Sequence, residues 1–193
     1  MKRNCTALIL AAFSWPGVSQ SQPATVDVYI NSHDASSQLL GPATPLASDL
    51  FKKIGVRLNW HTGEPQAGQT ALAIRTEQHA PESATREALA ASRLSGSTMV
   101  EITIYGDRLR RFLDAHRSLA GVAAGYVLAH ELAHAIQGVD RHSESGIMKA
   151  HWSDVDFHEM VFHKLAFAPV DVELINQALA IRQATQVTEA GGK

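Results

Sequence analysis

The sequence contains a single cysteine, Cys5, among its 193 residues, and it has no long block of charge of one sign. One cysteine cannot form an internal disulfide, so the fold must be held by an ordinary hydrophobic core. The 17 Lys and Arg residues against 19 Asp and Glu residues give a net charge of -2, and no basic stretch suited to a nucleic-acid backbone is present. We therefore expect no nucleic-acid partner.

Residues 1–21 have the pattern of a secretory signal peptide. A short basic start, Met1–Asn4, precedes the uncharged apolar run Cys5–Phe13, which is about half as long as a bilayer span requires. We predict that this segment is removed and that the mature protein is secreted or periplasmic. Residues 22–193 would then form a single domain without cysteine and without a membrane anchor, and we expect it to be a monomer.

The periodicity of apolar residues predicts both strands and helices in the mature chain. The predicted strands are residues 26–30, 56–60, 72–74 and 100–105. The predicted helices are residues 45–54, 118–137 and 154–166, with a last helix beginning at Pro169 and a disordered tail from residue 188. Residues 61–70 and 77–98 are expected to be loops, with a helix over Glu82–Leu94 as the alternative for part of them. This order of elements predicts an α+β fold.

The longest predicted helix, Ser118–Gln137, contains no proline and ends at Gly138. Gly121 and Gly125 lie four residues apart on it, and we expect them to let the helix lie close against the sheet. Its last turns carry residues 130–134, with the sequence His-Glu-Leu-Ala-His. We therefore expect the functional site at the C-terminal end of this helix.

His130 and His134 are four residues apart on one helix, so their imidazoles share a face and can bind one metal ion. Glu131 lies beside the first histidine, where its carboxylate can reach water bound to that ion. Catalytic zinc sites use three protein ligands and leave a fourth position for water, whose pKa the zinc lowers to about 7. The pattern thus predicts a Zn²⁺-dependent hydrolase in which Glu131 is the general base.

The third ligand is expected after the turn at Gly138, and three residues are candidates. We favour His142 because histidine is the better zinc ligand. Asp140 and Glu159 remain as carboxylate alternatives. Two surface histidines beside a helical glutamate, without metal, are the simplest competing explanation.

Residues 130–148, HELAHAIQGVDRHSESGIM, resemble the metzincin clan of zinc metallopeptidases. The signature of that clan is His-Glu-x-x-His-x-x-Gly-x-x-His followed by a turn that contains methionine. Here Gly138 and His142 lie one and two residues further along than in the signature, and Asp140 occupies the signature's third-ligand position. The resemblance implies that Met148 is the methionine of the turn, which lies beneath the metal without binding it.

The metzincin resemblance also implies a fold and an activity. A small mixed sheet and the active-site helix, in about residues 22–138, would lie over a short helical C-terminal subdomain, in about residues 139–193. The two would form one catalytic domain with a cleft between them. A peptide or protein substrate would lie extended along an edge strand, expected at Met99–Tyr105. The implied function is that of an exported zinc peptidase.

Two other functions fit parts of the pattern. A zinc-binding structural or interaction protein would have the metal site without turnover, although such a site needs no carboxylate like Glu131 beside its first ligand. A metal-dependent endoribonuclease with three histidines has a Gly-x-Asp-His ending, which Gly138–His142 resembles loosely, with Arg141 as an extra residue. The predicted signal peptide and the absence of a basic surface disfavour that enzyme.

Overall fold

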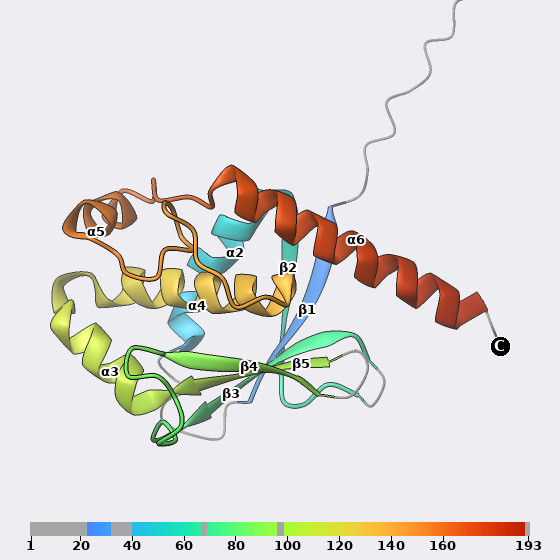
Figure 1. The fold of residues 1–193 in the computed structure, drawn as a ribbon, viewed down its shortest axis with the longest axis horizontal. Coiled ribbons are helices and arrows are strands. Elements are labelled where there is room, and N and C mark those ends of the chain that lie inside the picture. Colours follow the sequence, from blue (N-terminus) through green and yellow to red (C-terminus); the bar gives the residue numbers. More distant parts are fainter. Residues whose placement is uncertain (1–22, 32–39, 67–68, 96–98, 192–193) are drawn as a thin grey trace, which may run out of the picture.

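The computed structural model describes residues 23–31, 40–66, 69–95 and 99–191, and they form an α+β fold with one five-stranded mixed sheet (Figure 1). The strands are β1 (Ala24–Ile30), β2 (Val56–Thr62), β3 (Ala71–Glu77), β4 (Ala90–Ser95) and β5 (Met99–Tyr105). Their order across the sheet is β2-β1-β3-β5-β4. Neighbouring strands are parallel except for β4, which is antiparallel to β5.

The described helices account for most of the rest of the chain. They are the 3-10 turn η1 (Gly41–Ala43), α2 (Thr44–Lys52), α3 (Gly106–Ala115), the 3-10 turn η2 (Arg117–Leu119), α4 (Ala120–Gln137), α5 (Asp154–Val161) and α6 (Pro169–Gly191). α4 is the central helix: it contacts strands β4 and β5 on one side and helices α2, α5 and α6 on others. In Figure 1 it lies between the sheet and α6.

Alternating strands and one nearly all-apolar helix build the core. In β1, Val26 and Val28 are buried beneath the helices, whereas Asp27 and Tyr29 point to the other face. The segment Arg117–Gln137 is long and apolar enough to cross a membrane, but 67% of it is buried inside the protein. The core contacts of α4 therefore account for its apolar character.

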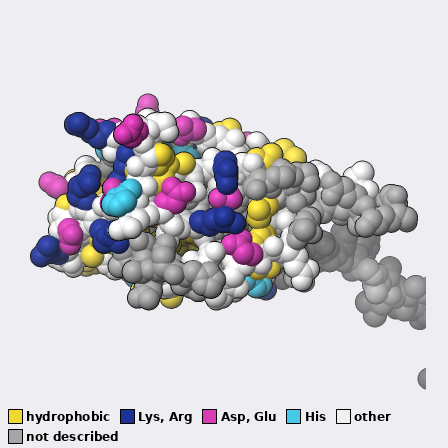
Figure 2. Space-filling model, turned by 90° about the horizontal axis from the view of Figure 1, so that it is seen from below, with side chains coloured by type: hydrophobic (Ala, Val, Ile, Leu, Met, Phe, Trp, Pro, Cys, Tyr) yellow, Lys and Arg dark blue, Asp and Glu magenta, His cyan; other side chains and the backbone are white. Residues whose placement is uncertain are grey.

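The face of the molecule drawn in Figure 2 carries charged side chains beside hydrophobic ones. Figure 2 shows basic and acidic side chains interspersed on the face seen from below Figure 1. On the sheet, Arg93 of β4 binds the buried carboxylate of Glu101 on β5 over 3.1 Å, and Arg75 of β3 binds Glu64 over 3.1 Å. Charges of both signs thus neutralise one another locally.

The structure confirms the α+β fold class and corrects several predicted elements. All four predicted strands lie within observed strands, but β4 falls in residues predicted to be a loop or a helix over Glu82–Leu94. The edge-strand prediction is wrong as well, because Met99–Tyr105 is β5, an inner strand between β3 and β4. The edge strand next to β5 is β4, whose sequence AASRLS has no apolar alternation that would reveal it.

The helices also differ from their predicted bounds. α3, Gly106–Ala115, was not predicted, α5 ends at Val161 instead of residue 166, and α6 continues to Gly191 where a disordered tail was expected. Gly125 is needed for close packing, but against α2: a Cβ there would lie 2.7 Å from the Leu46 side chain. Gly121 faces open space. The predicted signal peptide, residues 1–21, lies outside the described residues.

Candidate metal centre

The end of α4 places two histidines and one glutamate on the wall of a cavity. Gly138 ends the helix in the left-handed conformation, φ 68°, and its N–H donates to the His134 carbonyl oxygen over 2.9 Å. Glycine adopts this conformation without the steric cost that a side chain would bring. The chain then leaves the helix axis and returns past His130 and His134, as the sequence predicted.

Backbone carbonyl groups orient both helical imidazoles. His130 Nδ1 lies 2.8 Å from the Ile147 carbonyl oxygen, and His134 Nδ1 lies 3.3 Å from that of Val139. A carbonyl oxygen only accepts, so these partners favour the tautomers that carry hydrogen on Nδ1. The Nε2 lone pairs of both rings are then available to a metal, which is the usual arrangement of histidine ligands.

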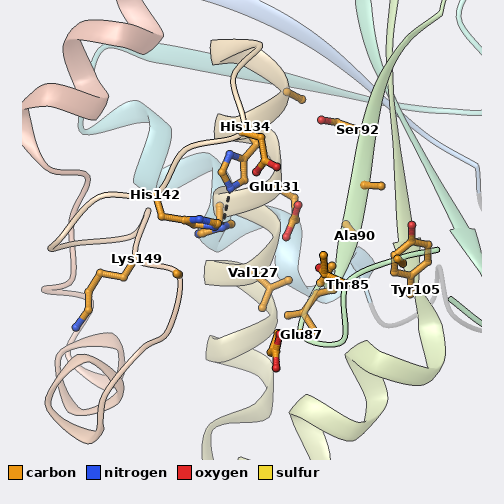
Figure 3. A pocket seen from close by; sticks show the side chains of 18 of the residues that line it. Thr85, Glu87, Ala90, Ser92, Tyr105, Val127, Glu131, His134, His142 and Lys149 are labelled. Carbon is orange, nitrogen blue, oxygen red and sulfur yellow. Dashed lines mark hydrogen bonds between the residues drawn. The ribbon is translucent and has the colours of Figure 1, made fainter. Parts of the chain in front are cut away.

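The two Nε2 atoms lie only 3.0 Å apart, a contact that Figure 3 marks with a dashed line. With hydrogen on both Nδ1 atoms, the contact brings two lone pairs together, which is unfavourable without a cation between them. Two nitrogens on one tetrahedral zinc ion, each at 2.0–2.1 Å, are separated by about 3.3 Å. The observed spacing of His130 and His134 therefore fits one shared ion.

His142 completes a group of three histidines that can hold a metal ion. One ligand atom from each of His130, His134 and His142 lies within 4.8 Å of the others. The ring centroid of His142 is 5.4 Å from that of His130 and 5.0 Å from that of His134. In Figure 3 the rings of His134 and His142 turn toward each other.

The two carboxylate alternatives for the third ligand lie outside this group. Asp140 lines the same cavity, but its carboxylate does not belong to the cluster of converging ligand atoms. Glu159 lies on α5, where its charge acts on the buried Tyr126 hydroxyl. The geometry thus brings His142, and neither carboxylate, to the two helical histidines.

Burial shifts the pKa values of the site in directions that suit metal binding. The pKa of His130 is lowered to about 4, mainly by burial. The neighbouring His134 and His142 act in the same direction, whereas the hydrogen bond to Ile147 acts in the opposite direction. Burial also lowers the pKa of His134. His130 is only 9% exposed, and it is neutral at physiological pH. It therefore needs to lose no proton before it binds a metal.

Glu131 is a half-buried carboxylate beside the histidines. Figure 3 shows it on the side of α4 that faces Ala90 and Ser92 of β4. Burial, together with a smaller contribution from the negative charge of Asp140, raises the pKa of Glu131 to about 7. In the metal-free protein this group can thus both take up and release a proton near neutral pH.

The cavity has a volume of about 1150 Å³ and is lined by residues of both α4 and β4. Besides the three histidines and Glu131, the lining includes residues 84–85, 87–94, 138–140 and 149–152, Tyr105, Phe112, His116, Val127, Phe157 and Arg182. Four of these residues form an aromatic group, consisting of Phe112, His116, Trp152 and Phe157, whose neighbouring rings lie 4.2–6.3 Å apart. No spacing pattern in the sequence indicated this group or β4.

The turn that contains Met148 supports His130. Met148 and Ile147 are fully buried. Gly146, at φ 77°, has no room for a side chain, because a Cβ would collide with the Ala166 carbonyl oxygen. The Ile147 carbonyl oxygen accepts hydrogen bonds from His130 Nδ1 and from Trp152 Nε1, the latter over 3.2 Å. The turn at Gly146 thus positions the Ile147 carbonyl group that orients the His130 imidazole.

The last helix, α6, is hydrogen-bonded to the end of α4. Arg182 of α6 donates to the carbonyl oxygens of Ala135 over 2.7 Å and Ile136 over 3.1 Å, in the last turn of α4. These carbonyl groups have no partner within their own helix, so a cation satisfies both their hydrogen bonding and the helix dipole. The helix that carries His134 is therefore capped by α6.

No protein-family model matches the chain, and none of the curated proteins is detectably similar to it. The likeness to metzincins accordingly rests on the motif in residues 130–148. What is established is the three-histidine group that can hold a metal ion.

Proposed function

We propose that the protein is an exported Zn²⁺-dependent peptidase that hydrolyses bonds in peptides or proteins. The observation that carries this proposal is the convergence of three imidazoles next to Glu131 on the wall of one large cavity. The donor set fits zinc, which binds imidazole nitrogen and has three protein ligands at catalytic sites. His130, His134 and His142 would hold the ion.

Glu131 would act as the general base. Zinc bound at the three histidines supplies a water of lowered pKa and polarises the substrate carbonyl group. The Glu131 carboxylate accepts a proton from the attacking water and passes it to the leaving amine. Its position directly after His130 on α4 places it in the same cavity as the three ligands.

β4 and the aromatic group support a peptide as the substrate. β4 is an edge strand that pairs with β5 on one side and borders the cavity on the other. An extended peptide can add to such an edge through main-chain hydrogen bonds, while pockets receive its side chains. Trp152 lies 5.7 Å from His130, ring to ring, so the aromatic group offers an apolar pocket next to the metal ligands.

Substitution Glu131→Gln tests the proposal. We expect the variant to bind zinc and to hydrolyse a mixture of unstructured peptides at least about 100-fold more slowly than the wild type, since general acid–base catalysis contributes about that much or more. Glu87→Gln is the matched control, because Glu87 lines the same cavity without belonging to the histidine group. Unchanged hydrolysis by the zinc-loaded Glu131→Gln variant would refute the catalytic role.

A zinc-binding interaction protein is the alternative from another class. It would bind zinc through the same histidines and bind peptides without cleaving them. Incubating the zinc-loaded wild type with the peptide mixture and analysing the products by mass spectrometry distinguishes the two. Peptides that bind but stay intact would favour the alternative.

A further inference from the structure

His142 is held differently from the other two histidines. The His130 and His134 rings each donate to a carbonyl group, whereas the His142 ring makes no hydrogen bond within the part of the chain that the structure describes. It is exposed and lies in the irregular segment between α4 and α5. Its direction must therefore be fixed through its neighbours in the chain.

Both neighbours of His142 bind one buried carboxylate. Arg141 Nη1 donates to Asp171 Oδ1 over 2.9 Å, and Ser143 Oγ donates to the same oxygen over 2.6 Å. Arg141 Nη2 also donates to Ser143 Oγ over 3.3 Å. Asp171 lies in the first turn of α6 and is 0% exposed. We call Asp171, Arg141 and Ser143 the Asp171 clamp.

The clamp determines where His142 points. Arg141 and Ser143 are both held at α6 by their hydrogen bonds to Asp171. The ring of His142 between them lies beside the rings of His130 and His134 instead.

A buried carboxylate at this position is costly unless it is paired. Asp171 Oδ2 is buried without a hydrogen-bond partner among the described residues, so the two bonds to Oδ1 and the N-terminus of α6 offset the cost. The ion pair of Asp171 with Arg141 also links α6 to a segment about 30 positions earlier in the chain. An apolar contact would join the same elements without the cost of burying a charge, but it would not orient two side chains.

We propose that Asp171 is a positioning residue for the metal site: through Arg141 and Ser143 it orients His142 and thereby sets the affinity of the site for zinc. The proposal rests on the three-histidine metal site of the proposed function. Groups that orient metal ligands typically change metal affinity 10- to 100-fold when they are removed.

The test compares zinc affinities of the full mature chain. We expect Asp171→Asn to raise the zinc Kd 10- to 100-fold, measured by competition with a chromogenic chelator, and to change the visible absorption of the Co²⁺-loaded protein. Ser143→Ala, which keeps the Arg141–Asp171 ion pair, should raise the Kd by less. The control is Glu101→Gln, which alters another buried, Arg-paired carboxylate away from the histidines and should leave the Kd within twofold.

The outcomes separate this proposal from the proposed function. A wild type that binds no zinc would overturn both. A wild type that binds zinc, with an unchanged Kd in Asp171→Asn and an equal loss of stability with and without metal, would show that Asp171 only anchors α6. If Asp171→Asn does not fold, the zinc Kd of Ser143→Ala is the test. A Kd within twofold of the wild-type value would refute the role of the Asp171 clamp in zinc binding.

Discussion

Glu131 is subject to two opposing requirements at the scale of a single residue. The proposed catalysis needs a carboxylate in the cavity beside the three histidines, whereas burial disfavours an ionised carboxylate there and raises the pKa of Glu131 to about 7. In the unfolded chain the same group has its ordinary pKa of 4.5. The folded, metal-free protein therefore holds a proton on Glu131 between pH 4.5 and 7 that the unfolded chain has already lost.

This difference predicts that Glu131→Gln stabilises the metal-free protein at alkaline pH. The folded pKa is raised, so the contribution of Glu131 to stability is lost as pH rises from 4.5 through 7, and above pH 7 the cost is about 3 kcal/mol. We expect the chelator-treated variant to exceed the wild type in free energy of unfolding by about that amount at pH 8 and to match it at pH 4. Urea unfolding at both pH values measures the difference. If the free energies of unfolding of the variant and the wild type differ by the same amount at both pH values, the raised pKa of Glu131 is not the cause.

At the scale of elements, the turn around Gly146 shows how a backbone conformation supports a ligand. Only glycine fits there, and the next residue, Ile147, supplies the carbonyl oxygen that orients His130. We predict that Gly146→Ala lowers the free energy of unfolding by about 2 kcal/mol or more and weakens zinc binding.

Gly121→Ala is the matched control for that substitution. Gly121 lies in the first turn of α4, and a Cβ at this position would meet open space, so alanine should raise the free energy of unfolding by about 0.5 kcal/mol. Thermal unfolding of both variants, with and without zinc, gives the comparison. Equal effects of the two substitutions would show that the Gly146 turn has no special role.

Elements with a strong periodic pattern could be predicted from the sequence, and so could the pair of histidines on one face at the end of α4. Residues 26–30 and 118–137 carry such patterns, and His130 and His134 share a helical face by spacing alone. β4 could not be predicted, because its residues face the cavity and solvent and so lack an apolar alternation. α3 had a usable signal in Leu109, Phe112 and Leu113, spaced for one helical face.

Contacts between distant segments could not be read from the sequence. Which residue joins His130 and His134 depends on the path of an irregular loop, which follows from contacts to α6 and not from local preference. The role of Asp171 could not be predicted from the sequence either, because Asp171 lies about 30 positions beyond the residues that it binds. The aromatic group likewise joins residues of α3 with residues around α5.

For the whole molecule, a bound ion would join the end of α4 to the irregular segment that follows it. A ligand that binds only the folded state at 1,000 times its Kd stabilises a protein by about 4 kcal/mol. We predict that chelation lowers the melting temperature of the zinc-loaded wild type and that His142→Ala abolishes this zinc-dependent difference. His79→Ala, an exposed histidine outside the cluster, should retain it. Equal zinc-dependent stabilisation in His142→Ala would exclude His142 as a ligand.

The hydrogen bonds from α6 to the end of α4 have a consequence for the order of events during synthesis. Arg182 and Asp171 leave the ribosome after every histidine of the metal-binding group. Until they emerge, the last turn of α4 lacks its cap and the loop that carries His142 lacks its attachment. A nascent chain would thus hold the three histidines in their final arrangement only once α6 has been made, so metal binding would come late in biosynthesis.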